Sequence, residues 1–190
     1  MPANTGADHV TIAAAPLPGL RGTDHVGLTV PDLEQAITFF TEVMGCELIY
    51  RMGPFIDDGN WFADELGLDP RARIPAMSLM RCRTGVNLEL FQYEAPHQRK
   101  ELPRMSDWGG HHLAFYVDDI DAALAGLREH HVDTIGRLKP GLGPEAGDGT
   151  GWIFFRAPWG MPLELVSYPN GRAYEATTSA RLWNAAYPDR

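Results

Sequence analysis

The sequence predicts an α+β fold made of two βαβββ modules, and three observations support this prediction. A strand pattern that contains histidine occurs twice, at residues 23–30 and 110–117. Each copy runs directly into an amphipathic helical pattern. Each module later ends in a short strand with a glutamate between two leucines, at residues 88–90 and 163–165. We therefore expect one structural unit that is repeated in tandem.

The composition is that of a globular protein with a sizeable core. The chain has 190 residues, of which 44% are hydrophobic, and a net charge of −9. The negative charge argues against nucleic acid as a partner. No apolar run approaches the roughly 20 residues that span a membrane, and the N-terminal stretch lacks the basic start of a secretory signal. We expect a cytoplasmic protein in which Cys46 and Cys82, whose spacing matches no disulfide or metal motif, are reduced thiols.

The first module is expected over residues 22–93, after a flexible extension of residues 1–21. Alternating apolar residues predict its first strand, at residues 25–30. Asp32, with a glutamine three residues later, is a helix-capping pattern, and Gly45 is expected to end that helix. The other expected elements are strands at 46–52, 75–81 and 86–93, and an insertion at 53–73 with a short helix at 61–66. An insertion of this length is often a binding loop, so we expect it to close over a site.

The second module is expected over residues 110–168, after a polar connector of residues 94–109. An acidic segment at 118–121 is expected to start the helix of this module, at the position equivalent to the helix start of the first module. Apolar residues follow it at helical spacing. Its other expected elements are strands at 132–138, 151–156 and 161–166 and a loop at 139–150. The aromatic tail, residues 169–190, is expected to dock over the site, with a helix from Tyr174 to Ala186.

Strand alternation decides which histidine of each copy faces away from the helix. In the first strand the apolar residues lie on one face, and His25 lies on the other. In the second strand the same argument places His112 opposite the apolar face and His111 on the helix side. The repeat and the alternation therefore select His25 and His112 as equivalent residues.

Two glutamates complete a set of metal-binding side chains. Glu89 and Glu164 each stand between two leucines, and a glutamate inside an apolar strand is costly unless it is paired or bound to a cation. Two imidazoles and two carboxylates suit a borderline divalent ion such as Zn, Ni, Co, Mn or Fe(II). The predicted ligands of one such ion are His25, Glu89, His112 and Glu164. Two octahedral positions would stay open, where the ion could polarise a substrate oxygen and stabilise an adjacent carbanion.

Four segments carry a resemblance to a known family: residues 24–33, 87–90, 111–121 and 158–165. In these segments and in their order, the sequence resembles the vicinal oxygen chelate superfamily, also called the glyoxalase/bleomycin resistance/dioxygenase superfamily. The resemblance implies paired modules that curl into a half-open barrel of mixed and antiparallel strands, with the helices outside and one divalent metal ion inside. It also implies the same four metal ligands.

Members of this superfamily catalyse several reactions, so the family does not settle the chemistry. The second histidine strand looks most like that of methylmalonyl-CoA epimerase, although the strand at 74–80 has no carboxylate in place of that enzyme's catalytic acid. Glyoxalase I has an arginine and an asparagine that bind glutathione, at places that look like Thr29 and Tyr93 here. The sequence thus departs from the known substrate contacts of both enzymes.

We predict a metal-dependent isomerase, epimerase or lyase, whose small-molecule substrate chelates the metal through adjacent oxygen atoms. Glu89 or Glu164 would be the catalytic residue that moves a proton at the carbon next to a carbonyl group. The alternatives are an Fe(II)-dependent dioxygenase of the same superfamily and a ligand-binding protein of the bleomycin-resistance type. The modules could pair within one chain or across a homodimer, because the connector is long enough for either.

Overall fold

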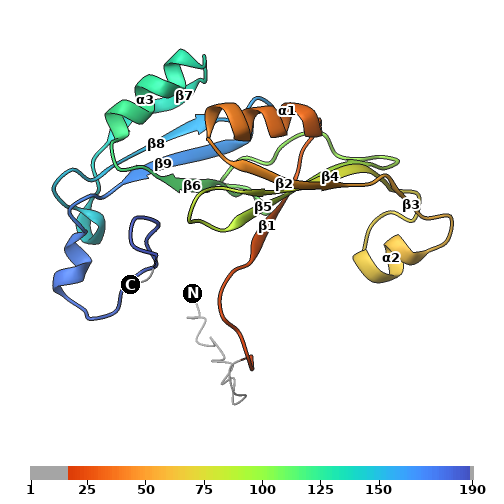
Figure 1. The fold of residues 1–190 in the computed structure, drawn as a ribbon, viewed down its shortest axis with the longest axis horizontal. Helices are drawn as coiled ribbons and strands as arrows, with labels where there is room; N and C mark the ends of the chain where they lie inside the picture. Colours follow the sequence, from red (N-terminus) through yellow and green to blue (C-terminus); the bar gives the residue numbers. More distant parts are fainter. Residues whose placement is uncertain (1–16, 189–190) are drawn as a thin grey trace, which may run out of the picture.

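The computed structural model describes residues 17–188 as two curved sheets that lie side by side, with helices α1 and α3 on the same outer side (Figure 1). The first sheet is formed by β1 (His25–Thr29), β2 (Glu47–Met52), β3 (Phe55–Ile56), β4 (Arg73–Arg81) and β5 (Asn87–Glu94). Its helices are α1 (Leu33–Thr38), the π-helical turn η1 (Phe39–Val43) and α2 (Trp61–Leu66). The second sheet is formed by β6 (Leu113–Tyr116), β7 (Thr134–Lys139), β8 (Gly151–Arg156) and β9 (Pro162–Ser167), with helix α3 (Ile120–Glu129). The short helices η2 (Gly143–Glu145) and η3 (Ala173–Ala176) complete the chain.

The strand order repeats from one sheet to the other. The first sheet has the order β1-β5-β4-β2, with β3 paired to β4, and the second has the order β6-β9-β8-β7. In each sheet the first strand pairs in parallel with the last one, and the other pairs are antiparallel. This confirms the predicted α+β class and the βαβββ repeat. Within residues 17–188 no strand pair joins the two sheets, so the barrel stays open.

Helices α1 and α3 start in the same way. The Asp32 side chain accepts a hydrogen bond from the backbone N–H of Gln35 at 3.0 Å, and that of Asp119 accepts one from Ala122 at 2.9 Å. Both are N-caps that satisfy a free N–H of the first turn. After η1 the chain reverses at Gly45, whose φ of 66° lies in the left-handed region. The predicted start of the first helix and its end at Gly45 are therefore confirmed.

One hydrophobic core serves both modules. Leu28 and Val30 of the first strand belong to the same buried cluster as Leu163 and Leu165 of β9. The ring centres of Phe39 and Phe40 lie 5.9 and 6.0 Å from that of Trp159, in the turn between β8 and β9. The modules are thus joined by side-chain packing on their helix sides, which leaves the opposite faces of the sheets free to form a site.

The cysteines form a disulfide, so the expectation of reduced thiols was wrong. Strands β2 and β4 pair Glu47 with Arg81 in an antiparallel register. The next pair in this register is Cys46 opposite Cys82, and the structure joins these two residues with a Cα–Cα distance of 4.3 Å. The contact depends on the strand register, which the spacing of the cysteines along the chain does not reveal.

The tail does not form the helix that was expected at Tyr174–Ala186. It contains one short 3-10 helix, at Ala173–Ala176. Beyond it, the Arg181 guanidinium donates to the backbone oxygens of Thr178 and Ala180 at 2.6 and 2.9 Å, and these side-chain bonds hold an irregular path. The insertion contains α2 at the predicted residues. Among residues 17–188 there is no helix with the length and apolar character needed to span a membrane.

Candidate active site

The first predicted pair lies on the first sheet. His25 begins β1, and Glu89 lies in β5 opposite Gly27. The His25 Nε2 atom is 3.2 Å from a carboxylate oxygen of Glu89. Its other ring nitrogen, Nδ1, is 2.8 Å from the Asp24 carboxylate. The pKa of His25 is raised, first by this hydrogen bond to Asp24 and then by the negative charge of Glu89.

The second pair lies at the equivalent place on the second sheet. Glu164 of β9 lies opposite Ala114, two residues after His112, just as Gly27 follows His25. The His112 Nε2 atom is 3.1 Å from a carboxylate oxygen of Glu164, and the histidine ring packs edge-on against Phe154 with centres 5.0 Å apart. Burial raises the pKa of the Glu164 carboxyl group; the nearby His112 opposes this shift and Glu145 adds to it.

The structure therefore brings the four predicted residues together as two pairs, one on each sheet. No three histidine, cysteine or acidic side chains meet at one metal-sized site anywhere in residues 17–188. His111 turns away, with its Nδ1 atom 3.0 Å from the backbone oxygen of Gly109. Sequence reasoning missed Asp24 as the residue that orients His25. The signal was available, because a histidine ligand usually hydrogen-bonds through its other nitrogen and an acid directly precedes this one.

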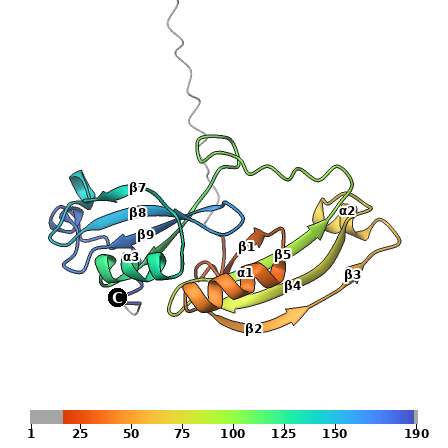
Figure 2. The same ribbon diagram turned by 90° about the horizontal axis from the view of Figure 1, so that it is seen from above.

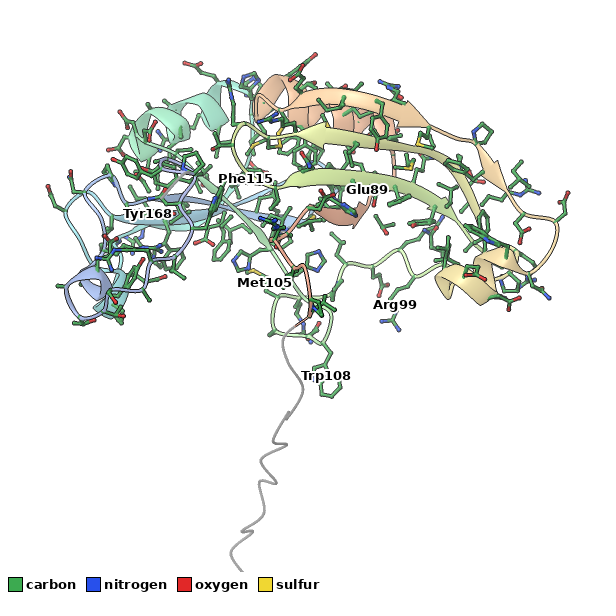
Figure 3. The ribbon with its side chains drawn as sticks, turned by 60° about the horizontal axis from the view of Figure 1, so that its bottom comes forward. Glu89, Arg99, Met105, Trp108, Phe115 and Tyr168 are labelled. Carbon is green, nitrogen blue, oxygen red and sulfur yellow. A yellow bond between two sulfur atoms is a disulfide. The ribbon has the colours of Figure 1, made fainter. Side chains whose placement is uncertain are left out.

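A cavity of about 1170 Å³ lies beside the second pair. His112 and Glu164 line it together with several aromatic side chains: Phe115, Tyr116, Trp152, Phe154, Tyr168 and Trp183. Burial, followed by the charge of Asp118, raises the pKa of Tyr116 to about 12, so its hydroxyl stays protonated at neutral pH. Figure 3 shows Tyr168 beside the second sheet and Glu89 on the first.

The tail and the insertion lie at different places relative to this cavity. Tail residues 182, 183, 185 and 186 line it, and the Thr84 hydroxyl donates to the Ala185 backbone oxygen at 2.8 Å. The tail is thus docked as expected. The insertion does not line the cavity, because α2 lies at the far end of the first sheet (Figure 1). The insertion therefore does not close over the second pair, and its closure over the first pair stays a prediction. The connector runs back from that far end along one side of the molecule (Figure 2).

Several known proteins are similar to this chain in sequence or in fold. The sequence profile described as the Glyoxalase/Bleomycin resistance protein/Dioxygenase superfamily matches residues 22–165. A protein from an Actinomyces species, named 2-epi-5-epi-valiolone epimerase, is 46% identical over 171 residues, or 88% of this chain and 90% of that protein. The protein YaeR of Escherichia coli strain K12 is 32% identical over 152 residues, or 77% of this chain and 96% of YaeR.

The fold is also found in a glyoxalase family protein from Bacillus cereus. Its structure has a TM-score of 0.62 at 22% sequence identity, over 81% of this chain and 98% of that chain. This likeness concerns the fold alone. The named epimerase, by contrast, is close enough in sequence to confirm the prediction of an enzyme of the isomerase or epimerase kind.

Proposed function

Because this chain belongs to the glyoxalase/bleomycin resistance protein/dioxygenase superfamily, we propose that it is a metal-dependent epimerase of a small ketone. A 46% identical relative is named 2-epi-5-epi-valiolone epimerase, and we propose the same compound as the substrate here. The observation that carries the proposal is the matched pair of His–Glu contacts, at 3.2 and 3.1 Å, on the two sheets.

The donor atoms of the two pairs fit a divalent ion. In each pair a histidine Nε2 and a carboxylate oxygen face one another, and both atom types bind borderline metals. The residues that would hold the ion, Zn, Ni, Co, Mn or Fe(II), are His25, Glu89, His112 and Glu164. When bound, such an ion supplies Lewis-acid polarisation of the substrate carbonyl, which makes the neighbouring C–H more acidic.

The two glutamates are suited to move that proton. Epimerisation next to a carbonyl needs a proton to leave one carbon and to return from its other face. Burial raises the pKa of the Glu164 carboxyl group above its ordinary value, which makes its carboxylate a stronger base. Glu89 occupies the equivalent position on the other sheet. We propose that one glutamate, as a carboxylate, takes the proton, and that the other, protonated beforehand, delivers its own proton to the opposite face of the carbon.

We further propose that a homodimer completes the site. One ion can reach all four ligands only if the two pairs meet, and they come from sheets that share no strand pairing within residues 17–188. A second copy would supply His112 and Glu164 to the His25 and Glu89 of the first. Exposed apolar side chains are present for such an interface, among them Ile49 on β2 and the fully exposed Trp108 of the connector (Figure 3).

Deuterium exchange tests the reaction. The metal-loaded enzyme in D₂O should place one deuterium at the inverted carbon of 2-epi-5-epi-valiolone, detected by NMR and by a mass increase. E164Q should slow this exchange roughly 100-fold or more, because general-base catalysis contributes about that much. The control E129Q, an exposed residue at the end of α3, should behave like the wild type. An unchanged rate in both E89Q and E164Q, or full activity after chelation, would contradict the proposal.

A mixing experiment tests the dimer. H25A and H112A should each be inactive alone. If sites are shared between two protomers, a mixed dimer regains one site with all four ligands, and activity appears on mixing. If each chain carries its own site, the mixture stays inactive, and the dimer proposal fails while the epimerase proposal stands.

A further inference from the structure

The segment after β9 places one arginine in the cavity beside the proposed active site. Arg172 lines the same cavity as His112 and Glu164. Its guanidinium carbon lies 4.0 Å from the ring centre of Tyr168 and 5.4 Å from that of Tyr174. Contacts of a cation with aromatic ring faces are attractive, so the two tyrosines hold the flat guanidinium group in place.

Backbone hydrogen bonds fix the position of this arginine without any ligand. The N–H of Arg172 donates to a carboxylate oxygen of Glu175 at 3.0 Å. The N–H of Ala173 donates to the backbone oxygen of Ala146 at 2.7 Å, which ties the segment to the loop after η2. Arg172 is therefore mounted on the cavity wall in advance.

The half-buried Arg172 side chain lacks the acidic partner that a partly buried cation usually has. Its Nε atom is buried and has no hydrogen-bond acceptor. The neighbouring acid, Glu175, uses its carboxylate on the Arg172 backbone and on Arg181, whose Nε lies 3.9 Å away. No acidic side chain of residues 17–188 forms an ion pair with Arg172. An unpartnered donor is costly, and a cation without a counter-charge is available to the oxygen atoms of a ligand in the cavity.

We propose that Arg172 binds a pair of oxygen atoms on the substrate, and this inference rests on the proposed function of the cavity as the substrate site. The guanidinium N–H groups form a planar fork that matches two neighbouring oxygens. Two chemical sources present such a pair: adjacent hydroxyl groups of a neutral substrate, and the anionic oxygens of a phosphoryl group.

Fluorescence titration tests this subsite without turnover, because Trp152 and Trp183 line the cavity. The metal-loaded wild type, R172M and R172K are titrated with 2-epi-5-epi-valiolone and, separately, with inorganic phosphate. R172M should bind at least one probe roughly 10- to 100-fold more weakly, the effect expected for a lost charge-assisted fork. R172K, which keeps the charge but not the fork, should lie between. The probe that is weakened identifies the source of the oxygens.

R181M is the matched control. Arg181 lies in the same tail and bonds to its backbone oxygens, but it does not line the cavity. It therefore reports loosening of the tail alone. The proposal is overturned if R172M binds both probes like the wild type, if R181M shows the same loss, or if the wild type binds neither probe. Failure of the epimerase proposal would look different: normal binding of a probe with no deuterium exchange.

Discussion

Removal of the disulfide should cost the fold roughly 4 kcal/mol of stability. The bond between Cys46 and Cys82 closes a loop of 36 residues, for which the loop-closure entropy of the unfolded chain is worth roughly 4 kcal/mol at 25 °C. The double variant C46A/C82A is the suitable change, because Cys46 is buried in the shared core and alanine places no polar group there.

Urea unfolding without reductant measures this loss. With a slope of about 2 kcal/mol per molar urea, the midpoint of the variant should lie about 2 M below that of the wild type. The wild type treated with reductant should unfold at the same urea concentration as the variant. If the variant does not fold, the reduced wild type measures the stability loss instead. A loss below about 1 kcal/mol, together with no effect of reductant on the wild type, would refute the reasoning.

Three further predictions follow from individual contacts. D24N removes the carboxylate that orients His25, so the metal affinity measured by isothermal titration calorimetry should fall roughly 10- to 100-fold. In the metal-free protein, an NMR titration should show a lower pKa for His25 in D24N than in the wild type. The pKa of Tyr116 is raised to about 12, so the neutral hydroxyl stabilises the fold below pH 10, and this contribution is lost as the pH rises toward 12. Between pH 10 and 12, urea unfolding should show a smaller loss of stability for Y116F than for the wild type. An equal loss in both proteins would contradict the assignment. F40A empties a fully buried site that packs against Trp159, and should cost about 3–5 kcal/mol in the same assay, against less than about 1 kcal/mol for a surface substitution such as R137A.

Much of the site follows from local patterns in the sequence. The alternation of the strands placed His25 and His112 opposite the helix faces, and each of them does meet the glutamate that stands between two leucines. The capping aspartate at residue 32 and the glycine at residue 45 bound the first helix for reasons that operate within a few residues. Such short-range rules do not depend on how the modules are arranged.

The parts that escaped prediction depend on long-range pairing. The Cys46–Cys82 contact needs the register of β2 against β4, which the spacing of the cysteines does not contain. The place of the tail is set by contacts such as Thr84 with Ala185, 101 residues apart. The role of Arg172 appears only once Tyr168 and Tyr174 surround it in the cavity wall.

The central claim is that both His–Glu pairs bind the same metal ion. Equilibrium dialysis with Zn, followed by elemental analysis, tests it most directly on the wild type, H25A and H112A. We expect one ion per chain in the wild type, and a large loss of affinity in each variant alone, because each removes one ligand of a common site. Wild-type affinity in either variant would contradict a shared metal site, since it would mean that one pair binds the ion without the other.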